Sequence, residues 1–328
     1  MKKNNPNKYK ILVTGNVNRE SINFLVDIAD LNFIHAYPSE DELISLVNDI
    51  DAILARSVVI SSKVIKAAKK LKIISRHGIG VDGVDVDAAT KQNIIVTNVP
   101  AQNANTVSEH IFALLLALSR KIIPAHEITR RNKWERNKLI GLELSEKVMG
   151  IIGFGNIGRL VAKKAQAFGM LVIIADPFID IVDAKKCNVK KVTFEELLKI
   201  SDFINISVPL TKDTEYMIGR NELQKMKKSV FLINTSRGKI VDENALYTFL
   251  SNGRIAGAGL DVLAQEPPPN DFKLNELSNV IITPHIAGQS KEALEKVAKR
   301  SAENIFNTLS GKIPENVFNK KVLQTLEI

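Results

Sequence analysis

Residues 148–158 read VMGIIGFGNIG, an aliphatic run that passes directly into a glycine-rich turn. The run predicts a buried strand, and the amphipathic residues after the turn predict a helix that reaches about Phe168. In such a turn Gly153 allows the tight bend, Gly155 lets a pyrophosphate approach the backbone, and Gly158 lets helix and strand pack closely. Glycine-rich turns also occur in loops for purely structural reasons. Here a predicted strand precedes the glycine turn and a predicted helix follows it. This context favours a dinucleotide site, with the phosphates at the start of the helix.

An acidic residue, Asp176, ends the next predicted strand at 172–175. A carboxylate at this point accepts hydrogen bonds from the ribose hydroxyls of adenosine and repels a 2′-phosphate. Pro177 and Phe178 follow it, where an arginine would be expected for a 2′-phosphate. The sequence therefore predicts NAD rather than NADP as the cofactor.

Strands alternate with helices on both sides of the turn, which predicts parallel sheets and an α/β fold. A first series has strands at 10–13, 52–54, 72–74 and 94–96, with helices near 21–28 and 62–70. A second series has six strands, the number of a full doubly wound sheet, at 148–152, 172–175, 203–207, 230–234, 256–261 and 280–283. Residues 106–119 are apolar nearly all round and predict a long buried helix and a hinge. A predicted helix at 291–309 would split the first domain if it packed on the first series.

Three side chains near the ends of predicted strands suit the chemistry of a 2-oxo acid. Arg237 follows the strand at 230–234, and a planar guanidinium can bind a carboxylate and the adjacent carbonyl. His285 follows the strand at 280–283, and histidine exchanges protons at neutral pH because its ordinary pKa is about 6.5. Glu266 could accept the other ring N–H and fix the tautomer. An isolated arginine is more often a surface salt-bridge partner, and an isolated histidine is often a capped core residue.

Composition narrows the class of protein. The chain has 328 residues, of which 45% are hydrophobic and 25% charged, so it is long enough for two globular domains. The longest apolar run, 111–118, is far shorter than the roughly 20 residues that cross a bilayer. Residues 1–10 lack the apolar stretch of a signal peptide, so we expect a cytoplasmic protein with no membrane partner. The single cysteine, Cys187, excludes an internal disulfide, offers no metal cluster, and is expected to be a small core or surface residue.

The net charge of +9 raises the question of nucleic-acid binding. Lysines and arginines are scattered, with modest clusters at 63–72 and 130–138, and aromatic residues do not interleave with them as a base-stacking surface requires. We therefore expect no nucleic-acid partner and interpret the basic residues as solvated helix faces that help to attract anionic ligands.

The chain resembles the D-isomer-specific 2-hydroxyacid dehydrogenases, and within them the phosphoglycerate dehydrogenases. The resemblance spans nearly the whole chain and rests on motifs in the family's order: Gly78-Ile79-Gly80-Val81-Asp82, the turn at 153–158 with Asp176, Pro209-Leu210-Thr211, Asn234-Thr235-Ser236-Arg237-Gly238, Gly259-Leu260-Asp261-Val262, Glu266-Pro267-Pro268 and Thr283-Pro284-His285. It implies two doubly wound domains, with a Rossmann NAD-binding domain (105–291) inserted in a flavodoxin-like substrate domain (1–104 and 292–328).

The resemblance also implies a role for each matching residue. Arg237 would bind the substrate carboxylate and carbonyl, Glu266 would orient His285, and His285 would be the acid and base. Cofactor contacts are implied at Ile79, Gly153, Gly155, Asn156, Ile157, Gly158, Asp176, Val208, Pro209, Thr235, Ser236, Arg237, Asp261, His285, Ala287 and Gly288, with Asp261 near the nicotinamide carboxamide. Substrate contacts are implied at Arg56, Ser57, Gly78, Ile79, Gly80, Arg237 and His285.

Several properties stay open between alternatives. Arg56 and Ser57 stand where phosphoglycerate dehydrogenases face the substrate phosphate, so 3-phosphoglycerate, and with it serine biosynthesis, is the first expectation. The chain ends at Ile328 without the regulatory domains of many such enzymes, so serine feedback is not expected and hydroxypyruvate or glyoxylate reduction is the alternative. A non-catalytic NAD-sensing corepressor would be expected to lose Arg237, Glu266 or His285. The family implies a homodimer, or a tetramer, with Trp134 either at the partner's site or a plain interface or core residue.

Overall fold

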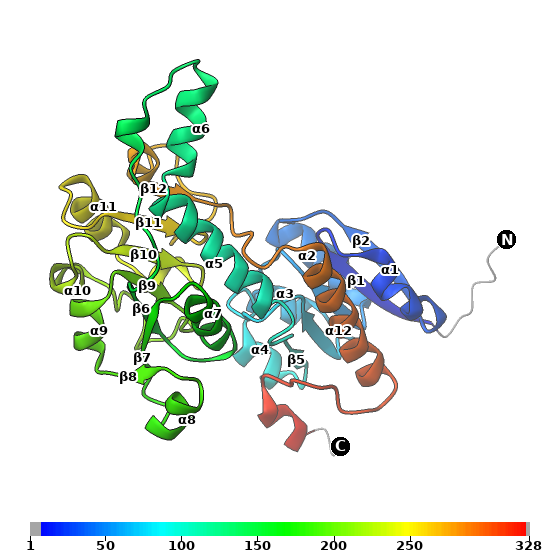
Figure 1. Cartoon of the computed structure of the whole chain (residues 1–328). Coiled ribbons are helices and arrows are strands. Elements are labelled where there is room, and N and C mark those ends of the chain that lie inside the picture. The colour runs from blue at the N-terminus through cyan, green and yellow to red at the C-terminus, as the bar shows by residue number, and fades with distance from the viewer. Residues whose placement is uncertain (1–7, 326–328) are drawn as a thin grey trace. The chain divides into compact units, whose positions relative to one another are not determined.

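The computed structural model describes residues 8–325, coloured in Figure 1. Residues 1–7, in the segment for which we expect no signal peptide, and 326–328, at the end of the predicted substrate domain, lie outside the described part. Contacts divide the chain into a first unit, Met1–Asn103 with Gln289–Ile328, and a second unit, Ala104–Gly288. Each unit has a parallel sheet with helices on both faces, which confirms the predicted α/β fold class.

The first unit contains a five-stranded sheet in the order β2-β1-β3-β4-β5, the flavodoxin-like order. Its strands are β1 (Tyr9–Thr14), β2 (Ala29–Ile34), β3 (Ala52–Ala55), β4 (Ile73–Arg76) and β5 (Ile95–Thr97). Its α-helices are α1 (Arg19–Ile22), α2 (Glu40–Leu46), α3 (Ser62–Ala67), α4 (Val86–Lys91) and α12 (Lys291–Leu309), and its short 3₁₀ helices are η1 (Asn23–Asp27), η2 (Val47–Asp49) and η6 (Lys320–Gln324). Strand β2 was not predicted, although its sequence ADLNFI alternates apolar and polar residues; it lies at the sheet edge and fully buries only Ala29.

Alternate side chains of the central strands enter two cores. Ile11 and Val13 of β1 pack with α1 and α12, whereas Leu12 packs on the other face with α2, α3 and α4. The buried residues of α12 recur at helical spacing, Ala298, Ala302, Ile305 and Leu309, so one apolar stripe covers the sheet. The helix predicted at 291–309 therefore packs on the first series of strands.

The second unit contains a seven-stranded parallel sheet in the order β12-β11-β10-β9-β6-β7-β8. Its strands are β6 (Val148–Ile152), β7 (Leu171–Ala175), β8 (Lys190–Lys191), β9 (Phe203–Ile206), β10 (Phe231–Asn234), β11 (Gly257–Leu260) and β12 (Val280–Ile282). Its α-helices are α5 (Ala104–Ser119), α6 (Ile122–Arg130), α7 (Asn156–Ala167), α8 (Ile181–Lys186), α9 (Phe194–Ile200), α10 (Arg220–Lys225) and α11 (Glu243–Ser251), and its 3₁₀ helices are η3 (Arg136–Leu139), η4 (Gly238–Ile240) and η5 (Lys273–Glu276).

The predicted count of six strands is wrong by one. The additional strand, β8, consists of two lysines at the edge of the sheet and has no apolar run that a periodicity reading could detect. Helices α5, α7 and α8 cover one face of this sheet, and α9, α10 and α11 cover the other. Strand β6, which leads into the glycine turn, lies next to β9. From β6 the strands that follow in sequence are added first on one side, β7 and β8, and then on the other, from β9 to β12, so the strand order reverses between β6 and β9. Ligands of doubly wound folds bind at such a point.

No helix within residues 8–325 is both long and apolar enough to cross a membrane. The same residues contain no cluster of three metal-ligating side chains. The thiol of the single cysteine, Cys187, accepts a hydrogen bond from Arg159 at 3.2 Å.

Candidate active site

The predicted site residues of the second unit gather at one edge of its sheet. All its strands are parallel, so their carboxyl ends meet at that edge. Each group of residues follows its own strand there: Gly153, Gly155, Asn156, Ile157 and Gly158 after β6, Asp176 after β7, Val208 and Pro209 after β9, Thr235, Ser236 and Arg237 after β10, Asp261 after β11, and His285, Ala287 and Gly288 after β12.

The glycine turn leaves room for a dinucleotide. Gly153 has a φ of +87°, and a Cβ there would stand 2.6 Å from the Ser207 carbonyl oxygen, so only glycine fits. At Gly155, the first residue before α7, a Cβ would meet no atom within 4 Å. No described side chain caps the first amides of α7. This open space beside uncapped helix amides fits a pyrophosphate.

The Asp176 carboxylate is fixed beside this turn. One oxygen accepts a hydrogen bond from the Phe154 amide at 2.7 Å, and the other accepts one from the Phe178 amide at 2.8 Å. The backbone thus directs a negative charge to the end of β7, where the predicted ribose contact lies.

We expect Asp176→Asn to weaken discrimination against NADPH. The variant keeps an oxygen for the Phe154 amide but removes the charge that repels a 2′-phosphate, so the ratio of the NADPH to the NADH dissociation constant should fall about tenfold or more. Fluorescence titration with each cofactor measures the ratio. An unchanged ratio would show that Asp176 does not select the cofactor.

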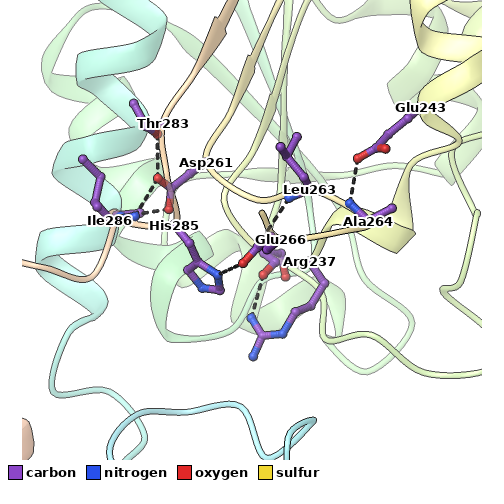
Figure 2. Close-up of polar contacts among 11 residues, drawn as sticks. Arg237, Glu243, Asp261, Leu263, Ala264, Glu266, Thr283, His285 and Ile286 are labelled. Carbon is purple, nitrogen blue, oxygen red and sulfur yellow. Dashed lines mark hydrogen bonds and ion pairs between the residues drawn. The ribbon is translucent and has the colours of Figure 1, made fainter. Parts of the chain in front are cut away.

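A histidine and a glutamate of the site form a hydrogen-bonded pair. The Nδ1 atom of His285 lies 2.7 Å from Oε2 of Glu266, as Figure 2 shows. The other oxygen of Glu266 accepts a hydrogen bond from the Leu263 amide at 3.0 Å. Burial raises the pKa of Glu266, but the hydrogen bonds from His285 and Leu263 and the charges of His285 and Arg237 outweigh burial and lower this pKa below its ordinary value. Glu266 is therefore an anion that fixes Nδ1 as the protonated ring nitrogen.

A buried aspartate holds the turn that carries His285. His285 has a φ of 54°, a left-handed conformation that costs about 1 kcal/mol in a residue other than glycine. The Asp261 carboxylate accepts hydrogen bonds from the Ile286 amide at 2.9 Å, the Ala287 amide at 2.8 Å and the Thr283 hydroxyl at 2.6 Å. Because that hydroxyl donates to Asp261, it accepts from His110 Nε2, 3.0 Å away on α5. These contacts stabilise the turn.

Arg237 lies close to the same carboxylate as His285, that of Glu266. Its Nη1 donates to the Ser236 carbonyl at 2.6 Å, and the Asn234 side chain bonds both the Ser236 amide and the Arg237 carbonyl. A Cβ on Gly238 would stand 1.9 Å from the Leu263 carbonyl carbon, so the two backbones touch at this point. The loop of Arg237 therefore packs directly against the loop of Glu266. The second unit brings Arg237, Glu266 and His285 together (Figure 2).

The predicted site residues of the first unit form a separate group. Arg56 and Ser57 follow β3, and Gly78, Ile79 and Gly80 follow the adjacent strand β4.

Two arginines, Arg56 and Arg76, lie near the buried His77. The Arg56 guanidinium donates to the Asn16 carbonyl. His77, the residue before Gly78, is buried. Burial, together with the charges of Arg56 and Arg76, lowers the pKa of His77 to about 3, so its ring is neutral. Arg56 and Arg76 thus contribute two positive charges at the carboxyl ends of β3 and β4.

Sequence reasoning did not assign a role to His110, Thr283 or Glu243. Glu243 accepts a hydrogen bond from the Ala264 amide, in the loop of Glu266. His110 gave one signal, a titratable residue in a helix that is otherwise nearly apolar. Trp134 has 77% of its surface exposed, so it is not a core residue of this chain. Its place at the partner's site, or at a plain interface, stays a prediction.

Named relatives match most of the chain. It is 42% identical to a D-3-phosphoglycerate dehydrogenase of Archaeoglobus fulgidus over 94% of this chain and 59% of that protein. It is 40% identical to a glyoxylate reductase of Korarchaeum cryptofilum, over 88% of this chain and 89% of that one. It is 39% identical to a hydroxypyruvate reductase of Thermotoga maritima, over 92% and 99% respectively. The chain thus spans about three fifths of the length of the phosphoglycerate dehydrogenase that it matches.

Solved structures show the same fold. The TT0316 protein of Thermus thermophilus superposes with a TM-score of 0.88 at 32% identity, over 94% of this chain and 99% of that one. A D-lactate dehydrogenase of Aquifex aeolicus, complexed with NAD and lactic acid, gives a TM-score of 0.84 at 30% identity over the same shares of the two chains.

Residues 112–287 match the family model described as "D-isomer specific 2-hydroxyacid dehydrogenase, NAD binding domain". The match covers the glycine turn, Asp176 and the cluster of Arg237, Glu266 and His285, and it confirms NAD as the cofactor. With the relatives above, it confirms the resemblance found in the sequence motifs. The chain belongs to the D-isomer specific 2-hydroxyacid dehydrogenase family.

Proposed function

We propose that the protein transfers a hydride between nicotinamide and C2 of a small D-2-hydroxy acid. The observation that carries the proposal is the 2.7 Å contact of His285 with Glu266, beside Arg237 and at the same sheet edge as the dinucleotide turn. When bound, NADH supplies the hydride. The side chains of the chain itself bind the acid, polarise its carbonyl and supply the proton.

His285 is the acid and base of this proposal. With Nδ1–H bonded to Glu266, the ring exchanges a proton through Nε2, giving it to the substrate oxygen during reduction and taking it back during oxidation. Glu266 stabilises the protonated ring, as a carboxylate does in other histidine pairs. Arg237 binds the substrate carboxylate through two parallel hydrogen bonds and polarises the carbonyl. The amides of Ile79 and Gly80, in the first unit, are further candidates to bind that carboxylate.

D-3-phosphoglycerate is the substrate that we propose first, which places the reaction in serine biosynthesis. Support comes from Arg56, which lies with Arg76 at the carboxyl ends of β3 and β4, where the two guanidinium charges add to burial in lowering the pKa of His77. Relatives named D-3-phosphoglycerate dehydrogenase agree with this choice. Relatives named glyoxylate reductase and hydroxypyruvate reductase, of similar identity, support reduction of an unphosphorylated acid as the second candidate.

A substrate profile tests both candidates. Initial rates of NADH oxidation are measured at one fixed NADH concentration with phosphohydroxypyruvate, hydroxypyruvate, glyoxylate and pyruvate. The first candidate predicts the highest kcat/KM with the phosphorylated acid. Equal values with and without the phosphate would rule it out and leave the second candidate.

Arg56→Ala should raise the KM for phosphohydroxypyruvate about tenfold or more and change the KM for glyoxylate little, because a charge-assisted hydrogen bond to phosphate is lost. Lys66→Ala, on the exposed side of α3, removes the same charge as a matched control. The KM values of both variants are compared with those of the wild type. A parallel increase for both acids would mean that Arg56 has a structural role.

We further propose a cytoplasmic homodimer. Helix α6 buries none of its residues within the chain, and Ile122 and Ile123 are 55% and 41% exposed, as expected of a surface that a second copy covers. Light scattering measures the mass in solution. A monomeric mass at assay concentrations would contradict the dimer.

A further inference from the structure

Glu243 makes one contact that the mechanism above does not use. It is the first residue of α11, directly after Asp242, which caps the helix. Its Oε1 accepts a hydrogen bond from the Ala264 amide at 2.7 Å. Ala264 lies in the loop after β11 that carries Glu266, so this bond joins α11 to the loop of the proposed active site (Figure 2).

The loop is held at three successive points. At Leu263 its backbone touches Gly238, where no side chain would fit. The Leu263 amide donates to Glu266 itself at 3.0 Å, and the next amide, at Ala264, donates to Glu243. Two consecutive backbone amides therefore donate hydrogen bonds to two different carboxylates. The first bond orients the Glu266 side chain, and the second fixes the peptide from which that side chain extends.

The surroundings of Glu243 disfavour its negative charge. Burial raises the pKa of Glu243, the Ala264 bond opposes this, and the nearby charges of Glu266 and Asp242 raise the pKa further. A carboxylate that only served the helix start could remain in solvent, since the positive end of α11 is available at the surface. The position of Glu243 is thus better explained by the loop that it holds than by the helix that it begins.

We propose that Glu243 is a positioning residue, which holds the 263–266 loop so that Glu266 stays within hydrogen-bond distance of His285. The inference rests on the proposed function, because it assigns Glu243 to the acid–base pair of that reaction. A displacement of about 1 Å in such a pair can lower a rate by as much as 10²-fold. Glu243 therefore affects kcat without touching substrate or cofactor.

Two conservative substitutions distinguish the effect of the length of the Glu243 side chain from the effect of its negative charge. Glu243→Asp keeps the charge at the start of α11 but shortens the side chain, so it no longer reaches the Ala264 amide. Glu243→Gln removes the charge but keeps an oxygen at the same length. We expect kcat to fall roughly tenfold in the aspartate variant and to stay near the wild-type value in the glutamine variant, with unchanged NADH affinity in both. The opposite order, or equal losses in both variants, would overturn the proposal.

Asn244→Ala, one residue further along α11 and exposed, is the matched control and should keep the wild-type kcat. A second measurement places Glu243→Asp in a Glu266→Ala background. If Glu243 acts through Glu266, the second substitution adds no further loss of kcat; additive losses would contradict this. Failure of the proposed function itself would appear separately, as a wild-type protein without turnover or a Glu266→Ala variant with normal turnover.

Discussion

Replacing His285 with alanine is expected to lower kcat for reduction of the preferred 2-oxo acid by ~10²-fold or more and to leave the affinity for NADH nearly unchanged. Within the cluster the imidazole is the group suited to deliver the proton, because histidine is the side-chain type that ordinarily exchanges protons at neutral pH and the lowered pKa of Glu266 keeps that carboxyl an anion. Its contact with Glu266 keeps it in the tautomer that the transfer requires. Steady-state kinetics at saturating NADH measure kcat, and fluorescence titration measures the dissociation constant of NADH.

His35→Ala is the matched control for this experiment. His35 also pairs with a carboxylate, Glu42, at 3.0 Å, but it lies in the first unit and its side chain is 63% exposed. We expect the control to keep the wild-type kcat. Near-normal turnover of the His285 variant would exclude His285 as the acid.

Arg237→Gln should lower kcat/KM for every 2-oxo acid by about 10²- to 10³-fold, since two charge-assisted hydrogen bonds to the substrate carboxylate are lost. Arg237→Lys should restore only part of the activity, because an ammonium does not bind a carboxylate through two parallel donors. The loss should be similar for phosphorylated and unphosphorylated acids, which share the carboxylate. This pattern distinguishes Arg237 from Arg56, whose loss should depend on the phosphate.

Arg254→Gln removes the same charge from an exposed position of the second unit and should leave kcat/KM unchanged. The measurement is kcat/KM with phosphohydroxypyruvate and with glyoxylate for all variants. A variant of Arg237 with wild-type kcat/KM would remove the guanidinium from substrate binding.

The central strands could be predicted because their physical signal is local. Strand β6 has consecutive aliphatic residues that are buried on both faces of its sheet, and the glycines after it fit the turn for steric reasons. The edge strand β8 was not predicted, because its two lysines carry no apolar pattern. The edge strand β2, ADLNFI, does alternate apolar and polar residues, and the prediction overlooked it, although only Ala29 of this strand is fully buried.

Some polar groups of the site could likewise be predicted from the sequence, and others could not. Arg237 and His285 follow strands of a parallel sheet, so their common edge follows from the topology alone. The bond from Glu243 to Ala264 and the chain from His110 through Thr283 to Asp261 join segments that no periodicity relates. Such contacts depend on how loops pack after the sheet forms, and they became visible only in the structure.

The most direct test of the central claim follows a labelled hydrogen. The protein is given NADH that carries deuterium at the transferable position of nicotinamide, together with the 2-oxo acid that it reduces fastest. Mass spectrometry and chiral chromatography then locate the label in the product. Our account predicts deuterium on C2 of a D-2-hydroxy acid, formed at a rate that falls with His285→Ala. Product without the label, or NADH that binds while none of the 2-oxo acids is reduced, would contradict it.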